Sequence, residues 1–244
     1  PMAIEESSVV AAASKAAKFW MSRGGFKAEI LGTEKIGQVH FTFSGDSKKI
    51  SAFFEDHKAQ IIEDLKPHTE SMERRGGGLK SLELINRTNT LEHYYQLHAT
   101  FETLDAMGAN FINTCLEQIA ESWQRLYNEK ASFKSADQEL VVIMSILSNY
   151  VPGCVVRAEV SCPVSELSEA DGIDPQLFAN KFVQAVRIAE VEPYRAVTHN
   201  KGIMNGIDAV VLATGNDFRA IEAAAHAYAA KDGSYSSLTH ATIE

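Results

Sequence analysis

Hydrophobic and polar positions alternate with two different periods between residues 36 and 148. Ile36–Phe43 alternates and is rich in β-branched residues, which predicts a strand. Lys49–Lys66 has apolar residues at helical spacing, which predicts an amphipathic helix that Pro67 ends. The same criteria predict a strand, a turn, a strand, a helix and a strand at Leu79–Asn86, Arg87–Thr90, Leu91–Phe101, Gly108–Tyr127 and Leu140–Ser148.

This order, β-α-β-β-α-β, is typical of a split βαβ, or ferredoxin-like, unit. The flanking sequence is mostly Ala-rich and helical, with helices expected at Val9–Ser22, Pro175–Ala189, Asn205–Ala213 and Asp217–Lys231 and a strand at Val155–Ser161. We therefore predict an α+β protein. A small domain, residues 35–148, is inserted into a large, mainly helical domain formed by residues 1–34 and 149–244.

Composition narrows the class of protein. The 244 residues carry a net charge of −9, which argues against nucleic acid as a partner. No apolar run approaches the roughly 20 residues that span a bilayer, and the acidic start does not resemble a signal peptide. Three cysteines without metal-ligand spacing indicate free thiols and no metal. These features predict a cytoplasmic protein without a membrane partner.

The densest group of chemically useful side chains lies between Arg195 and Arg219. Arg195, Lys201, Asn205 and Asp217 stand among glycines that let the backbone approach a ligand. Lys201 has small and apolar neighbours in sequence, so burial could lower its pKa or hold its charge against an anionic centre. Such groups can bind a carboxylate, stabilise an oxyanion and relay a proton. The alternative is a glycine-rich connector between two helices.

Three stretches also resemble a known family. His199–Ile207 with Ala213–Asp217 (HNKGIMNGI and ATGND) is similar to the catalytic segment of class II (bacterial) 3-hydroxy-3-methylglutaryl-CoA (HMG-CoA) reductases. Pro1–Ser14 resembles the segment with that family's catalytic glutamate, and Asp105–Asn110 (DAMGAN) resembles its nicotinamide-cofactor motif. The three matches lie in the family's order over nearly the whole chain.

The resemblance implies roles for three catalytic residues. Glu6 takes the place of the catalytic glutamate, and its Ala and Val neighbours lead us to expect a desolvated, protonated general acid. Lys201 would stabilise the oxyanion that forms on the thioester carbonyl. Asp217 would couple these two groups. Without the resemblance, Glu6 and Asp217 are ordinary helix-start carboxylates and Lys201 is a solvated lysine.

The resemblance also implies binding residues for the acyl substrate. Ser8 matches a serine that binds the acyl substrate, and Arg195 matches an arginine that grips its free carboxylate, a group suited to a bidentate guanidinium. Asn205 lies four residues after Lys201, so it can orient the amine from the same helix face.

Cofactor binding is expected at a helix start, because N-terminal amides can hold a pyrophosphate without a Rossmann fingerprint, which this sequence lacks. Thr69 stands where NAD-using members have an aspartate. Threonine would not repel a 2′-phosphate, so we predict a preference for NADPH, with NADH also able to serve. The family match places these residues near the dinucleotide: Asp105, Met107, Gly108, Ala109, Asn110 and Asn149.

Sixteen positions separate Lys201 from Asp217. One continuous helix would hold them about 24 Å apart at about 1.5 Å per residue. They can meet only if Gly202–Gly206 is not helical or if the partner comes from another subunit. The family is dimeric with active sites at the subunit boundary, so the resemblance implies a homodimer or higher oligomer.

The implied reaction is the reduction of HMG-CoA to mevalonate and CoA, or the reverse, by two hydride transfers from NAD(P)H through mevaldehyde. The family's flap histidine has no match here, so the sequence resembles a core that lacks an N-terminal segment and the flap domain, and this core alone is expected to be weak or inactive. The alternative is a non-catalytic ferredoxin-like regulatory or assembly domain on a helical dimerisation core.

Overall fold

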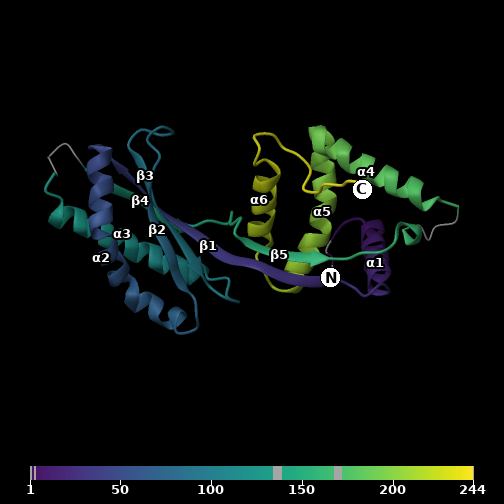
Figure 1. Cartoon of the computed structure of the whole chain (residues 1–244), viewed down its shortest axis with the longest axis horizontal. Coiled ribbons are helices and arrows are strands. Elements are labelled where there is room, and N and C mark those ends of the chain that lie inside the picture. The colour runs from purple at the N-terminus through teal and green to yellow at the C-terminus, as the bar shows by residue number, and fades with distance from the viewer. Residues whose placement is uncertain (1, 3, 134–138, 168–171, 244) are drawn as a thin grey trace. The chain divides into compact units, whose positions relative to one another are not determined.

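The computed structural model describes residues 2, 4–133, 139–167 and 172–243. They form two compact units: a small unit, residues 30–155, and a helical unit, residues 1–29 and 156–244 (Figure 1). The chain enters the small unit along strand β1 (Lys27–Phe43) and leaves it along strand β5 (Cys154–Glu159), which pairs with β1. The sequence-based boundaries, at residues 34/35 and 148/149, lie a few residues inside these limits.

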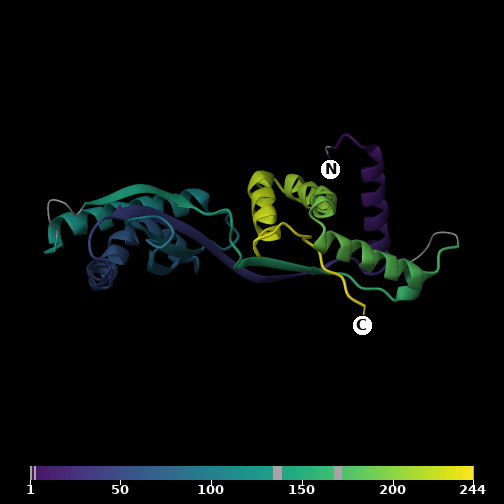
Figure 2. The ribbon, with the colours of Figure 1, turned by 90° about the horizontal axis from the view of Figure 1, so that it is seen from above.

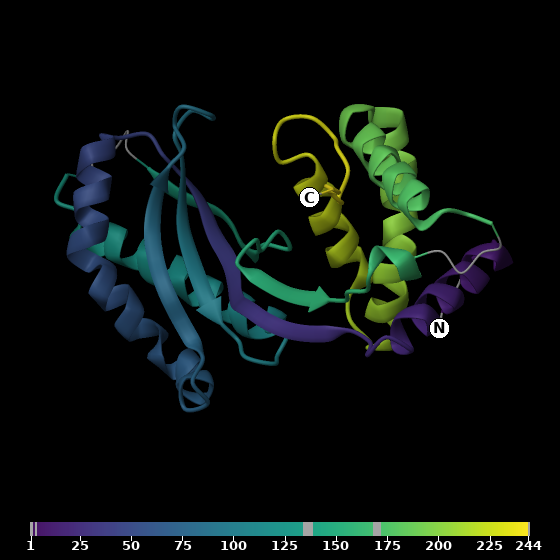
Figure 3. The same cartoon turned by 45° about the vertical axis from the view of Figure 1, so that its right-hand side comes forward.

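The helical unit contains helix α1 and three helices from the C-terminal part of the chain. Helix α5 packs against both α4 and α6 (Figure 3). The segment that follows α6 returns alongside α4, where the Ser236 hydroxyl donates to the Glu190 carbonyl oxygen at 2.9 Å (Figure 2). The bounds are α1 Ser7–Met21, the 3₁₀ turn η1 Val164–Glu166, α4 Pro175–Val191, α5 Pro193–Ala213 and α6 Phe218–Ala229.

Helix α5 is one continuous helix, so the prediction that it begins only at Asn205 is wrong. It begins at Pro193, where the Glu192 carboxylate accepts hydrogen bonds from the amides of Tyr194 and Arg195. Its buried residues recur every four positions, as Ala196, Asn200 and Met204. This buried stripe outweighs the roughly 1 kcal/mol that each internal glycine costs a helix.

The small unit is an antiparallel sheet covered by two helices, in the predicted order β-α-β-β-α-β. The strands lie in the order β2-β3-β1-β4. Val39 of β1 faces Leu97 of β3 and Ser145 of β4, so β1 and β3 are the central strands. The remaining bounds are α2 Ser47–Glu73, β2 Gly78–Asn86, β3 Tyr94–Glu102, α3 Ala109–Lys130 and β4 Leu140–Leu147.

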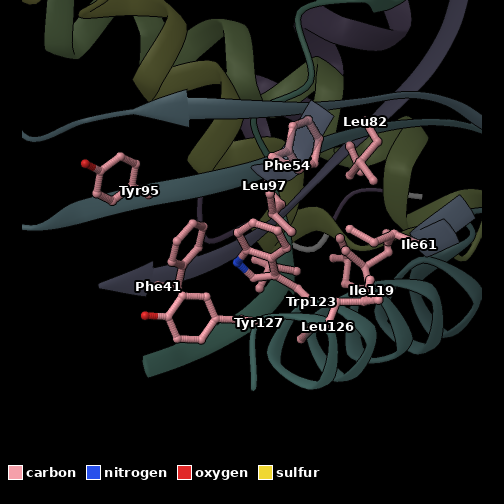
Figure 4. Close-up of a cluster of buried hydrophobic side chains, with 14 of the residues drawn as sticks. Phe41, Phe54, Ile61, Leu82, Tyr95, Leu97, Ile119, Trp123, Leu126 and Tyr127 are labelled. Atoms are coloured by element: carbon pink, nitrogen blue, oxygen red, sulfur yellow. The ribbon is translucent and has the colours of Figure 1, made fainter. Parts of the chain in front are cut away.

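The core of the small unit lies between the sheet and helices α2 and α3. Phe41, Phe54, Trp123 and Tyr127 are buried in it, and the Trp123 ring contacts the rings of Phe41 and Phe54 edge to face (Figure 4). Burial of one such large apolar side chain contributes about 1.5–3 kcal/mol. This well-packed core fixes the ends of the strands and of α3, where the predicted cofactor residues lie.

Helix α2 continues past Pro67, contrary to the prediction that this proline ends it. The helix runs to Glu73, with Pro67 on its exposed face. Leu65, Thr69 and Met72 remain on the buried face on both sides of the proline. Their packing exceeds the roughly 3 kcal/mol that an internal proline costs. Strand β1 likewise begins at Lys27, well before the predicted start at Ile36.

Candidate active site

Helix α5 presents Lys201 and Asn205 one turn apart. Lys201 is exposed and Asn205 is half-buried, so the expectation that Lys201 is buried is not met in this chain. Positions i and i+4 share a helix face, and the Asn205 amide can therefore position the Lys201 amine. Arg195 is also exposed, in the first turn of the same helix, and its guanidinium is free to face an anionic ligand.

The two residues before Lys201 hold the C-terminal segment. The fully buried Asn200 donates from Nδ2 to the Ser236 carbonyl oxygen at 2.9 Å and accepts from the Leu238 amide at 2.9 Å. His199 lies 2.7 Å from the Thr239 hydroxyl. Sequence reasoning missed this anchoring role of Asn200. Its signal was a polar residue inside the apolar i, i+4 stripe of α5.

Asp217 caps the N-terminus of α6. Its Oδ1 accepts hydrogen bonds from the amides of Arg219 at 3.0 Å and Ala220 at 3.3 Å. The Arg219 guanidinium pairs with the same carboxylate at 3.2 Å. Hydrogen bonds from this guanidinium, followed by those from the amides, lower the pKa of Asp217. The group is therefore a carboxylate at neutral pH, as a partner for an ammonium ion must be.

Glu6 and Ser8 lie together at the start of α1. The Ser8 hydroxyl donates to Glu6 Oε1 at 2.7 Å, and both residues are exposed. The expected desolvation of Glu6 by its Ala and Val neighbours is therefore wrong for this chain, because those side chains leave the carboxyl in solvent. Pro1 and Ala3 of the same sequence motif lie outside the described residues.

Among the described residues, no hydrogen bond or ion pair joins Lys201, Asp217 and Glu6. Lys201 lies twelve residues before Ala213, the last residue of α5, and Asp217 follows that end. The axial separation of Lys201 from the end of α5 is therefore about 18 Å. Because Gly202–Gly206 is helical, a non-helical segment there cannot bring Lys201 and Asp217 together within one chain.

The predicted cofactor motif forms the N-terminus of α3. Gly108 caps this helix in the left-handed region, at φ 79°, and a Cβ on it would lie 2.5 Å from Thr103 Cγ2. The Thr103 hydroxyl closes the turn by donating to the Ala106 carbonyl oxygen at 2.7 Å. Over the described residues, no side chain caps this helix start and its first turn has no acidic residue. The amides of this first turn therefore lack a side-chain acceptor and lie at the positive end of the helix dipole.

Asn149 lies at the same end of the small unit as this motif. Asn113, in the second turn of α3, accepts a hydrogen bond from the Leu147 amide at 3.1 Å, and Leu147 ends β4. Asn149 follows two residues later and is exposed, as are Asp105, Met107 and Asn110. Residues from two distant parts of the sequence thus surround one helix N-terminus. Sequence reasoning missed Asn113, which ties them together.

Thr69 does not lie on the surface. It is 2% exposed, and its hydroxyl donates to the Lys66 carbonyl oxygen at 3.4 Å. Thr69, which was expected to lie near the cofactor and not to repel a 2′-phosphate, therefore belongs to the buried face of α2 and does not face a ligand in this structure. The exposed cations near the C-terminal end of α2 are Lys66, Arg74 and Arg75.

The helical unit also contains an apolar cavity of about 810 Å³, between α1, α4 and residues 241–243. Phe19, Trp20, Phe178 and Phe182 line it. None of the predicted site residues does. In the described part of the chain, no cluster of three or more side chains could hold a metal ion, and no helix is long and apolar enough to cross a membrane.

Comparison with known proteins decides the family. The family model for hydroxymethylglutaryl-coenzyme A reductase matches residues 1–243. The 3-hydroxy-3-methylglutaryl-coenzyme A reductase of Archaeoglobus fulgidus is 37% identical over 241 residues, or 98% of this chain and 51% of that protein. The chain belongs to the hydroxymethylglutaryl-coenzyme A reductase family. The family predicted from the three sequence motifs is therefore confirmed.

Solved structures of the HMG-CoA reductase from Streptococcus pneumoniae have the same fold. One has a TM-score of 0.85 and 36% identity, over 100% of this chain and 55% of that one. Another, described as a class II HMG-CoA reductase bound to NADPH in open conformations, has a TM-score of 0.84, with 37% identity and 63% of its chain covered. The chain spans about half the length of the curated reductases it matches.

Proposed function

We propose that the protein is an HMG-CoA reductase that interconverts HMG-CoA and mevalonate with NAD(P)H, through two hydride transfers and a mevaldehyde intermediate. The observation that carries the proposal is the pairing of exposed Lys201 with Asn205 on one face of α5. An ammonium and an amide on one helix face are the groups that stabilise the oxyanion formed when a thioester is reduced.

The N-terminus of α3 fits the diphosphate of a dinucleotide. Its amides point outward without a capping side chain, and Gly108 lets a ligand approach the backbone closely. Asn110 and Asn149 supply exposed amides at the same end of the unit. When bound, the nicotinamide supplies the hydride. The role of this chain is to hold the cofactor's phosphates and orient its ring.

Catalysis at the acyl carbon needs stabilisation of negative charge on the carbonyl oxygen. The Lys201 ammonium provides the positive charge for this stabilisation, and Asn205 orients the ammonium. Glu6 gives a proton to the aldehyde oxygen, and Asp217, ionised by its contacts with Arg219 and the α6 amides, polarises the lysine and the glutamate. Arg195 binds the free carboxylate of the substrate, and Ser8 contacts its acyl part.

The site is completed in a homodimer. Within one chain, α5 separates Lys201 from Asp217 and Glu6 is left in solvent. The helical unit also exposes large apolar side chains that a second polypeptide would cover. Five examples, between 45% and 83% exposed, are Phe182, Val191, Val197, Val210 and Leu212. Cover by a partner subunit would also remove Glu6 from solvent.

The test is the rate of NADPH oxidation with HMG-CoA, measured at 340 nm on the full-length protein. Lys201→Ala should lower kcat by roughly 100-fold or more, because the only cation at the oxyanion is lost. Its circular dichroism spectrum should be unchanged, because the Lys201 side chain is exposed. Lys181→Ala is the matched control and should retain full activity, because Lys181 is an exposed lysine of α4.

Absence of turnover in the parent protein would instead support a regulatory or assembly role. The same assay measures cofactor choice. We expect a lower KM for NADPH than for NADH, carried by the exposed cations Lys66, Arg74 and Arg75 and not by Thr69. A lower KM for NADH would contradict this preference while leaving the reductase proposal intact.

A further inference from the structure

Two reactive side chains meet where the strands that connect the two units lie side by side. Lys35 of β1 and Cys154, the first residue of β5, are 119 positions apart in sequence, yet Lys35 Nζ lies 2.7 Å from Cys154 Sγ. Both belong to the small unit. Both residues are half-buried and neither is fully enclosed by the protein. The roles proposed for the active-site residues do not use this pair.

The backbone holds the thiol against β1. A Cβ on Gly32 would overlap the carbonyl oxygen of Gly153, so the turn before Cys154 touches the strand directly. The Cys154 amide donates to the Val151 carbonyl oxygen at 2.9 Å, which fixes the start of β5. The contact between amine and sulfur is thus a consequence of two paired strands.

The surroundings keep the lysine in place. Lys35 Nζ lies 3.4 Å from the Thr33 carbonyl oxygen. The charge of Lys35 is also one of the contributions that lower the pKa of Glu102, after the hydrogen bond from Thr33, which is the largest. Glu34, on the same strand, flanks Gly153. The amine therefore has neighbours that favour its present position.

We propose that Lys35 and Cys154 form a covalent cross-link when the protein is exposed to peroxide. In the first step the Cys154 thiolate attacks one peroxide oxygen. The S–O bond forms, the O–O bond breaks, and the second oxygen leaves as hydroxide, so sulfur loses two electrons and peroxide gains them. In the second step the neutral Lys35 amine attacks the sulfenic acid sulfur. The S–N bond forms, the S–O bond breaks, and water leaves.

Proximity makes the second step competitive. Two groups held in reactive contact reach effective concentrations on the order of 10⁵ M or more, far above those of competing nucleophiles in solution. A thiol reductant reverses the link, because two equivalents return the free thiol and amine and form one disulfide. The pair is therefore a reversible oxidation site.

The link would close a loop that contains nearly the whole small unit. A cross-link between residues 35 and 154 shortens the unfolded chain over 119 positions. Such long closures reduce the entropy of the unfolded state most strongly. Oxidation should therefore raise the Tm of the small unit by several degrees, and reduction should lower it again.

The experiment treats the reduced full chain with hydrogen peroxide, digests it and identifies peptides by mass spectrometry. The expected product is a peptide pair joined at Lys35 and Cys154, with the mass of the two peptides less two hydrogen atoms, which dithiothreitol separates. Cys115 serves as an internal control, because burial raises the pKa of its thiol to about 12 and it should stay unmodified.

Three variants sharpen the result. Lys35→Arg keeps the charge but not the nucleophilic amine, so Cys154 should remain a sulfenic acid that dimedone traps. Cys154→Ser should abolish the joined peptide. Cys162→Ser should not affect it, because Cys162 has no lysine contact among the described residues. If Lys35→Arg does not fold, reductive methylation of the native protein gives the same test, since a dimethylated amine cannot form the link.

Oxidation of Cys154 to sulfinic acid without a joined peptide would overturn the proposal. So would an unmodified Cys154, or a joined peptide that persists after Lys35→Arg. These outcomes do not depend on reductase activity, so failure here and failure of the proposed function remain distinct.

Discussion

Gly108 carries two constraints that only glycine satisfies at the proposed cofactor site. Its φ of 79° lies in the left-handed region, and a Cβ would lie 2.5 Å from Thr103 Cγ2. Thr103 is itself buried and closes the turn onto Ala106. The position of the α3 amides therefore depends on the absence of one methyl group.

We expect Gly108→Ala to destabilise the small unit by about 2–4 kcal/mol, the sum of left-handed strain and overpacking. It should also raise KM for NADPH, because the amides of α3 move. Gly76→Ala is the matched control: its φ is 94°, but a Cβ there meets nothing within 4 Å. Urea denaturation should show a loss of about 1 kcal/mol for that variant, and its KM should not change. Equal losses in both variants would refute the role of the Thr103 contact.

His199 makes stability depend on pH. Burial, and then the charge of Arg195, lower its pKa from an ordinary value near 6.5. The folded state therefore binds fewer protons than the unfolded state, so the free energy of unfolding falls as pH drops from about 6.5 toward the lower folded pKa. Below the folded pKa this loss is complete.

His199→Gln should make the free energy of unfolding less dependent on pH between pH 7.5 and pH 5, measured by urea denaturation at several pH values. At pH 8 His199 is neutral in both the folded and the unfolded protein. The difference in the free energy of unfolding between the parent and the variant at that pH therefore reports only packing and the lost contact with Thr239. A parallel pair of curves from pH 8 to pH 5 would show that His199 does not titrate differently on folding.

Sequence reasoning found residue types more reliably than residue environments. Spacing predicted that Lys201 and Asn205 share one helix face, and the structure places them on one face of α5. The burial of Thr69 and the exposure of Glu6 were not found. Both depend on which side of a helix packs against another element, and neighbours in sequence do not determine that.

At the scale of elements, periodicity predicted the kind and order of elements in the small unit, because each has an apolar face that one sheet or one helix layer buries. The predicted helix boundaries were wrong where tertiary packing outweighs the local helix propensity of proline and glycine. Helix α2 passes through Pro67, and α5 passes through Gly202 and Gly206. In both helices a buried stripe continues across the residue that should have ended or weakened the helix.

Pro67→Ala tests this account of α2. Pro67 is exposed, so alanine removes the ring's clash with the carbonyl of Glu63 and restores an amide donor without changing the core. We expect the free energy of unfolding to rise by about 1–3 kcal/mol, seen as a higher urea midpoint. The neighbouring exposed Lys66→Ala should change it by less than about 0.5 kcal/mol. A loss of stability in Pro67→Ala would mean that the backbone has adapted to proline.

At the scale of the whole molecule, the insertion of the small unit was predictable because its flanks differ in composition and period. The assembly of the proposed site was not, since Lys201, Asp217 and Glu6 make no hydrogen bond or ion pair with one another in the described part of one chain. Lys201 lies about 18 Å along the helix axis from the end of α5, which Asp217 follows, and the exposed apolar residues of the helical unit have no partner element in the described chain. The proposed second subunit would account for both observations.

Subunit complementation distinguishes a shared site from a site within one chain. Lys201→Ala and Asp217→Asn should each abolish NADPH oxidation as pure full-length proteins. If the two residues of one site come from different subunits, each mixed dimer contains one site with both native residues. Random exchange should then restore about a quarter of the parent activity, since half the dimers are mixed and each has one working site. If both residues come from one subunit, each site in every mixed dimer lacks one of them and the mixture stays inactive. Unfolding and refolding the two variants together, with the parent protein treated alike as the control for recovery, gives the measurement.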